Sequence, residues 1–239
     1  MFFLWLFLFT VVALQVSALC TTIYLHRTLS HKGVEVSPHL ALAMHAWLIL
    51  FTGISPRDWM AVHRKHHHFS DKEGDPHSPY LLGLWNVFFR NVPLYRKTAA
   101  DPTVIRKYTA DYRPTLIDRI PSQGYGVLLG WAIFALLFGW LWGTVAFFTH
   151  AIVYVQLNAA INSFCHVVGY RNFTNKATNI QWLAWITAGE ALHNNHHEYP
   201  AAAHFSMRRG EFDPAWPVIR TLEGVGLLRV KRHPVAKAA

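Results

Sequence analysis

The stretch FFLWLFLFTVVALQVSALCTTIYLHRTLSH, residues 2–31, decides the fold, because a long apolar run ends directly in two histidines. Residues 1–26 contain no Lys, Arg, Asp or Glu. A bilayer core about 30 Å thick needs roughly 20 apolar residues in a helix. We therefore expect a membrane span over about 2–25, with His26 and His31 just past its inner end.

A second uncharged run covers residues 120–170 and is long enough to cross a bilayer twice. It predicts a helical hairpin with spans over about 121–141 and 144–165, turning where glycines and tryptophans coincide. All 22 Lys and Arg residues consequently lie in 27–119 and 171–239. This segregation accounts for the net charge of +9 without nucleic acid, which we exclude as a partner, and indicates an integral membrane protein.

Both basic segments then face one side of the membrane, which the positive-inside rule makes the cytoplasm, and the N-terminus lies outside. Residues 36–56 are also uncharged, but a span there would put the histidines near 63 across the membrane from His26. We expect a membrane-associated segment instead. The expected fold class is all-α: a single domain over 1–239, with a cytoplasmic helical cap that holds a di-metal site. Residues 216–230 should form an interfacial helix of that cap.

Histidine is the residue that points to a function, since the chain contains 16 of them. The spacing HxxHH occurs twice, in HRKHH (63–67) and HNNHH (193–197), and residues at i, i+3 and i+4 share a helical face. Each triplet can therefore cap a metal ion. His26 and His31 are five residues apart and need a helix end or a break to share a site. The full set of candidate ligands is enough for two metal ions: His26, His31, His63, His66, His67, His166, His193, His196 and His197.

The donor type favours redox chemistry with dioxygen. Imidazole suits iron, zinc and copper, but the sequence contains no HExxH motif of a hydrolytic zinc site. Carboxylate-bridged di-iron proteins have several ExxH pairs, and here only Glu190 and His193 have that spacing. We expect Glu190 to orient His193, and Asp71 and Asp75 to serve the 63–67 triplet in the same way. His77 is expected beside them.

The remaining histidines are interpreted as structural. We expect His68 to point away from the triplet face, and we expect these five to be core residues with satisfied hydrogen bonds: His39, His45, His150, His204 and His233. A metal transporter is the alternative from another class of protein. It would need polar residues along its spans, and the first span offers only Gln15, Ser17 and a few threonines.

HRTLSH (26–31), HRKHH and HNNHH, in this order, resemble the three histidine boxes of membrane fatty acid desaturases, most closely the stearoyl-CoA-type Δ9 group with its bacterial members. Trp59, DPH (75–77) and NSFCHVVGYR (162–171) also match that group. The resemblance implies two non-haem iron ions with the nine histidines above as ligands, and Asn162 holding a metal-bound water. It places Trp59 and Ala159 at the acyl tunnel, although Ala159 replaces an aromatic residue of the animal enzymes. Those enzymes also have two spans before the first box, where this chain has one.

The implied activity is oxygen-dependent desaturation, which puts a cis double bond into a long-chain fatty acyl group carried by CoA, acyl carrier protein or a lipid. The Δ9 position comes from the resemblance alone, and hydroxylation on the same scaffold is the alternative. The C-terminal RHPVAKAA is not the HPGG of an attached cytochrome b5. We therefore expect a separate electron donor, such as ferredoxin, rubredoxin or cytochrome b5 with an NAD(P)H reductase. The expected location is a bacterial inner membrane, in contact with lipid.

Overall fold

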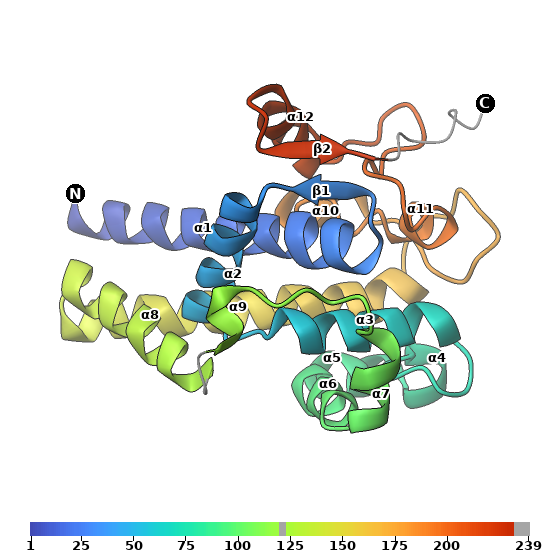
Figure 1. Cartoon of the computed structure of the whole chain (residues 1–239), viewed down its shortest axis with the longest axis horizontal. Coiled ribbons are helices and arrows are strands. Elements are labelled where there is room, and N and C mark those ends of the chain that lie inside the picture. The colour runs from blue at the N-terminus through green and yellow to red at the C-terminus, as the bar shows by residue number, and fades with distance from the viewer. Residues whose placement is uncertain (120–122, 232–239) are drawn as a thin grey trace.

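Apolar helices form an arm at one end of the molecule, and shorter helices form a broader cap at the other (Figure 1). The computed structural model describes residues 1–119 and 123–231. In chain order the elements are α1 (Phe2–Cys20), η1 (Thr21–Ser30), β1 (Val34–Val36), α2 (Pro38–Phe51), α3 (Pro56–Phe69), α4 (Pro79–Leu82), α5 (Leu84–Phe89), α6 (Asn91–Ala99), α7 (Pro102–Tyr108), η2 (Leu116–Arg119), α8 (Gln123–Phe138), α9 (Trp140–Val167), α10 (Gln181–Ile186), α11 (His193–Glu198), α12 (Ala215–Gly224) and β2 (Leu228–Val230).

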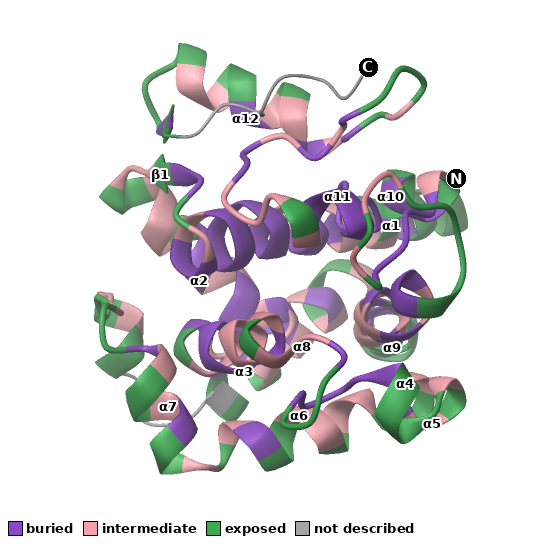
Figure 2. Cartoon of the chain, turned by 90° about the vertical axis from the view of Figure 1, so that its right-hand side faces the viewer, coloured by how far each residue is buried: buried purple, intermediate pink, exposed green. Residues whose placement is uncertain are grey.

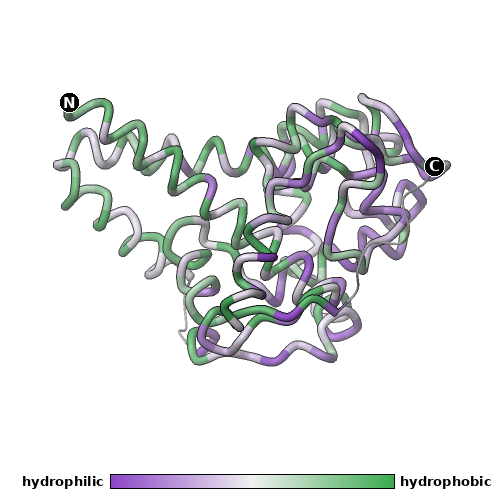
Figure 3. Tube along the Cα trace, turned by 90° about the horizontal axis from the view of Figure 1, so that it is seen from above, coloured by the Kyte–Doolittle hydropathy of each residue, from purple (hydrophilic) through white to green (hydrophobic). Residues whose placement is uncertain are grey.

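The arm consists of α1, α8 and α9. The continuous helix Phe2–Ser30 and α9 are each long and apolar enough to cross a membrane, and Gly124–Phe138 of α8 is a shorter apolar helix. Figure 3 shows that hydrophobic residues dominate the arm, while hydrophilic residues gather in the cap. Large apolar side chains such as Phe7 and Leu136 lie exposed on it, as expected of helices that face lipid. The expected helical membrane fold is confirmed. Residues 120–122, at the start of the expected second span, lie outside the described residues.

The apolar segment 36–56 forms α2 and then bends by 91° into α3. Each of the two helices begins with a serine cap followed by proline: Ser37 accepts from the N–H of Leu40, and Ser55 accepts from the N–H of Asp58. Gly53, in the connection, has φ +66°, a left-handed conformation that glycine adopts without strain. The bend directs α3 against η1, so that its histidines meet those at the end of the first apolar helix.

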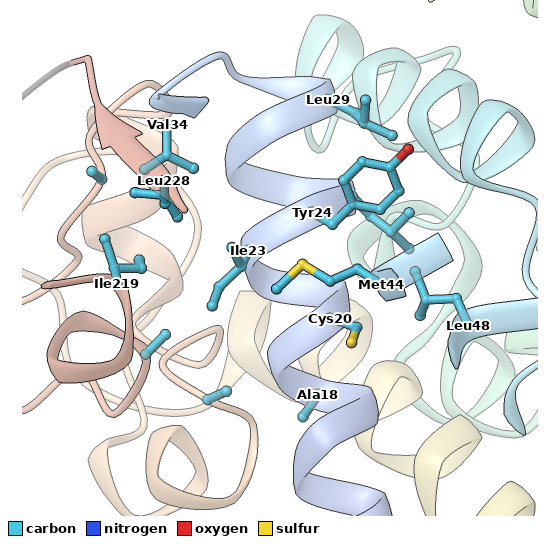
Figure 4. Packing of buried hydrophobic residues seen from close by; sticks show 14 of the residues in the cluster. Ala18, Cys20, Ile23, Tyr24, Leu29, Val34, Met44, Leu48, Ile219 and Leu228 are labelled. Carbon is cyan, nitrogen blue, oxygen red and sulfur yellow. The ribbon is translucent and has the colours of Figure 1, made fainter. Parts of the chain in front are cut away.

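The main core of the cap surrounds η1. Ile23, Tyr24 and Cys20 pack between Met44 and Leu48 of α2 on one side and Ile219 and Leu228 on the other (Figure 4). Figure 2 shows the buried residues gathered in the middle of the cap, with exposed residues on α5 and α7 at its edge. Buried side chains therefore fix the position of η1 from both sides.

The expectation of a continuous interfacial helix over 216–230 was wrong. Helix α12 ends at Gly224, the chain turns at Gly226 with φ +74°, and Leu228–Val230 forms a strand. That strand pairs antiparallel with β1, with Val34 opposite Val230, and adds a two-stranded sheet to an otherwise helical fold. Ile219 of α12 is fully buried, so this segment completes the core.

Most of the histidines that we interpreted as structural lie where we expected them. His45 is buried with its Nδ1 2.7 Å from Thr115 Oγ1, and the His150 Nε2 lies 3.0 Å from Ser17 Oγ. His204 stacks on Trp216, and His68 is exposed. His39 is exposed rather than a core residue, because the first turn of α2 faces outward. His233 lies outside the described residues.

Candidate metal centre and its cavity

A π-helical segment brings His26 and His31 together. In η1 the hydrogen bonds connect residues five apart, as between the N–H of His31 and the carbonyl of His26 (3.1 Å), and the Thr28 hydroxyl and the Ile23 carbonyl. Residues at i and i+5 therefore lie side by side, and the two imidazole centroids are 5.0 Å apart. This is the break in α-helical geometry that the sequence spacing required.

The candidate ligands form two groups. Group A contains five histidines and group B contains four, and within each group one ring nitrogen per residue lies within 4.8 Å of the others. Group A is His26, His31, His63, His67 and His196; group B is His66, His166, His193 and His197.

Each HxxHH triplet contributes to both groups, which corrects the expectation that a triplet caps one metal ion. His63 and His67 belong to group A while His66 belongs to group B; on α11, His193 and His197 belong to group B and His196 to group A. The physical reason is helical geometry. Residues at i and i+4 nearly eclipse, whereas neighbours along the chain point about 100° apart. Each helix therefore presents its triplet to two adjacent sites.

The spacing of the ring nitrogens suits a metal ion. In group A the Nε2 atoms of His26 and His196 are 2.9 Å apart, and those of His31 and His63 are 2.8 Å apart. In group B the Nε2 atoms of His166 and His193 are 3.1 Å apart, and those of His193 and His197 are 3.0 Å apart. Imidazole nitrogens about 2.1 Å from one ion and at right angles to each other would be about 3.0 Å apart. The two groups have the geometry of metal sites.

Three carboxylates hold the opposite ring nitrogens. Glu190 Oε2 lies 2.5 Å from His26 Nδ1. Asp75 Oδ1 lies 3.0 Å from His66 Nδ1, and Asp71 Oδ2 lies 2.7 Å from His166 Nδ1. A proton shared with the carboxylate at Nδ1 leaves the Nε2 lone pair free for a metal. Without an ion, these lone pairs would face one another in a buried space.

Two of these partners differ from those expected. Glu190 serves His26 rather than His193, and Asp71 serves His166 rather than the 63–67 triplet, whereas Asp75 does serve that triplet through His66. The sequence distances mislead because the partners come from different elements. The Nδ1 atom of His193 is buried and has no hydrogen-bond partner among the described residues.

The protonation states favour metal binding. Burial, followed by the neighbouring histidines, lowers the pKa of His193, His196 and His197 well below the usual 6.5, so these rings are neutral at physiological pH. Burial alone would raise the pKa of Glu190, but the charge and hydrogen bond of His26 outweigh it and the net pKa is lowered. Asp75 behaves in the same way beside His66. The rings of His193, His196 and His197 are therefore neutral, and the carboxylates of Glu190 and Asp75 are ionised.

His77 lies at the edge of group B, and Asn162 lies one helical turn before His166 on α9. The ring of His77 stacks on His66 with centroids 4.5 Å apart, and burial lowers its pKa to about 3. Its Nε2 has no hydrogen-bond partner among the described residues. The Asn162 side-chain amide donates to Asn91 Oδ1 over 3.0 Å. Both side chains face the same cavity.

The cavity has a volume of about 270 Å³ and reaches both groups, because its wall includes His63 of group A and His193 of group B. About half of the other residues in its wall are apolar or aromatic, and α6 and α9 contribute polar side chains. Trp59 lines the cavity and stacks on His63 with ring centroids 4.6 Å apart. Ala159 is fully buried, but among the described residues its neighbours Asn158 and Asn162 face the cavity and it does not.

The sequence did not single out the buried ion pair beside group A. Arg27 is 1% exposed, donates from Nη2 to Asp213 Oδ2 over 2.8 Å, and lies 3.8 Å above the Phe205 ring. It follows His26 directly, so the ion pair fixes the backbone of that histidine. Asn158, which lines the cavity, was also missed. The one signal in the sequence for this ion pair was the charge of Arg27, inside the HRTLSH motif and directly after His26.

The profile of the family described as "Fatty acid desaturase" matches residues 3–221. The similar proteins include three from Arabidopsis thaliana. Delta-9 desaturase-like 5 protein is 29% identical, with 92% of this chain and 74% of the relative covered. Delta-9 acyl-lipid desaturase 1 is 29% identical (89% and 70%), and Delta-9 desaturase-like 1 protein is 31% identical (92% and 74%).

The profile spans nearly the whole chain, including all nine histidines of groups A and B. Membrane-length apolar helices, two buried histidine groups and this match agree with one another. The chain belongs to the fatty acid desaturase family, whose members are oxidoreductases.

Proposed function

We propose that the chain is an oxygen-dependent di-iron desaturase that introduces a cis double bond into a long-chain fatty acyl group. The observation that carries this proposal is the cavity, whose wall contains His63 of group A and His193 of group B. A methylene pair held in it would lie beside both groups at once. The proposed Δ9 position comes from the names of the relatives, which are 29–31% identical to this chain.

Groups A and B are proposed to hold one iron ion each, with the nine histidines as ligands. Iron, when bound, supplies the reduction of dioxygen that removal of two hydrogens requires. Imidazole donors suit both iron and zinc, and membership of the family supports iron. Glu190, Asp71 and Asp75 orient the rings, and the Arg27–Asp213 pair holds the chain behind His26.

Substrate positioning falls to the cavity walls. Ile54, Val62 and Val155 offer apolar surface to an acyl chain. Trp59 forms part of the cavity wall and holds the ring of His63 by stacking on it. Arg96, Asn91 and Asn158 offer polar contacts to a carbonyl or a head group. Asn162 and His77, beside group B, are placed to hydrogen-bond a metal-bound water. The acyl carrier is proposed to be CoA, acyl carrier protein or a membrane lipid.

The remaining parts of the proposal concern surroundings and partners. The arm spans a bacterial inner membrane, with the cap and its two groups on the cytoplasmic side. The clustering of basic residues in the cap supports that orientation. Electrons come from a separate donor protein, such as ferredoxin, rubredoxin or cytochrome b5 with its NAD(P)H reductase.

The experiment is a product analysis with purified protein in lipid vesicles. Protein loaded with ferrous iron would receive electrons from a ferredoxin and its reductase, with an isotope-labelled saturated acyl substrate offered on each carrier in turn. We expect a product that has lost two hydrogens, and none from the His63→Ala variant. A product that has gained one oxygen atom would instead identify a hydroxylase. No oxidised product, from protein holding two irons, would contradict both.

A further inference from the structure

The two asparagines of HNNHH lie between the candidate ligands on α11 and are fully buried. Figure 1 shows α11 at the end of the cap farthest from the N-terminus. This helix has six residues, and Leu192, the residue directly before it, provides no side-chain cap. So short a helix is not stable by itself. Other residues must hold it in place, and it supplies ligands to both groups.

Asn179 caps α11 from a distant position in the chain. Its Oδ1 accepts from the backbone N–H of Asn194 over 2.9 Å and of Asn195 over 3.3 Å. Its Nδ2 donates to Asn195 Oδ1 over 2.9 Å. Asn179 is itself fully buried and pairs through its backbone with Tyr170 and Leu192. It supplies acceptors that the start of a helix otherwise lacks.

Glu211 joins this cap to two loops. Its Oε2 accepts from Asn195 Nδ2 over 2.8 Å and from the N–H groups of Met207 (2.7 Å) and Arg208 (3.0 Å). Its Oε1 accepts from Tyr170 Oη over 3.0 Å and Asn172 Nδ2 over 2.5 Å. Both oxygens are therefore surrounded by donors. A carboxylate is the side chain that accepts on every side.

We propose that Glu211 and Asn179 are positioning residues for α11, and through it for the metal sites. None of the hydrogen-bond partners of Glu211 among the described residues is a histidine; it acts through Asn195, which lies between His193 and His196. The inference rests on the proposed function, because it requires one iron in each group. Groups A and B depend on α11 to different extents. Group B takes His193 and His197, two of its four members, from α11, whereas group A takes only His196 of its five.

Group B therefore loses its iron first when this network is weakened. Glu211→Gln keeps the size of the side chain but turns an amide NH2 toward the donors that met one carboxylate oxygen. Changes behind metal ligands typically lower metal affinity by roughly 10–100-fold, and we expect that loss in group B. After challenge with a chelator, the parent retains two irons per chain and Glu211→Gln retains one.

Added ligand substitutions identify the group that keeps its iron. With Glu211→Gln, His166→Ala (group B) should remove no further iron, whereas His31→Ala (group A) should remove what remains. Glu223→Gln is the matched control. Glu223 also accepts a backbone N–H, from Val230 over 3.0 Å, but belongs to α12. It should retain both irons.

Iron release rates, measured on protein whose helical circular dichroism matches the parent, test the inference independently of activity. Should Glu211→Gln not fold, the half-buried Asn172→Ala removes one donor to Glu211 and should still speed release from group B. Equal release from both groups, or release at the parent's rate, would overturn the inference. A parent chain that binds fewer than two irons would overturn the proposed function itself, and this inference with it.

Discussion

At the scale of single residues, the carboxylates behind the histidines set which group each substitution affects. Glu190 holds His26 of group A, and Asp71 holds His166 of group B. We predict that Glu190→Gln weakens iron binding in group A and Asp71→Asn in group B, each by roughly 10-fold or more. Stepwise chelation followed by iron analysis would measure both. The control is Glu198→Gln. Glu198 is an exposed acidic residue next to His197, and its substitution should change iron binding in neither group.

A titration would test one ion pair that positions α3. Arg64 donates to the carbonyls of Leu29 and Ser30 at the end of η1 and pairs with Asp111. The hydrogen bond from Arg64 holds the pKa of Asp111 below its ordinary 3.8. The ionised carboxylate is thus favoured in the folded protein. Its stabilisation is complete above the ordinary pKa and disappears as the pH falls through the lowered one.

Asp111→Asn should therefore lower the melting temperature at neutral pH, and its difference from the parent should shrink below about pH 4. The effect should stay under about 1 kcal/mol, because the pair is partly exposed and screened by solvent. Thermal melting in detergent at several pH values would measure it. A difference that is constant across this range would rule out a contribution from the charge.

The sequence predicted the nine histidines because their spacing and order are local properties. It could not assign partners, since Glu190 reaches His26, and Asp71 reaches His166, only after the helices have packed. Glu211 carries no pattern at all: its donors come from three separate segments.

At the scale of elements, close packing of α8 against α2 should control the position of the bend. Gly126 and Gly130 on α8 form a GxxxG pair, and a Cβ on Gly130 would lie 1.9 Å from the Leu50 carbonyl oxygen. We predict that Gly130→Ala separates the helices and costs about 1–3 kcal/mol. The exposed Leu128→Ala is the control. Equal melting temperatures for the two variants would contradict this packing.

Uncharged runs in the sequence predicted the apolar helices, because the free energy of transferring a helix into lipid depends on the composition of that helix. The π-helical segment η1 and the 91° bend were not predictable from the same signal. Both are set by what packs around them: η1 lies between α2 and α12, and the bend lies against α8. The strand β2 likewise requires its partner β1, which lies nearly the whole chain away.

At the scale of the whole molecule, the histidine groups lie inside the cap, where the helix Phe2–Ser30 and α9 end, and one cavity reaches both. Under the proposed function, this arrangement would bring a hydrophobic substrate from the membrane to the two metal sites. The membrane class and the family could be inferred from the sequence, because they depend on composition and on ordered motifs. The division into groups A and B depends on how four helical elements, η1, α3, α9 and α11, converge, and only the structure reveals it.

The most direct test is the fatty acid profile of a desaturase-deficient host that expresses the parent chain or one of three variants. His31→Ala removes a member of group A, His166→Ala removes one of group B, and His68→Ala changes an exposed histidine outside both groups. We predict a new mono-unsaturated acid with the parent and His68→Ala, and none with either group variant. Unsaturation that persists in His31→Ala or His166→Ala, or that is absent with iron-loaded parent protein, would contradict a desaturase that needs both groups.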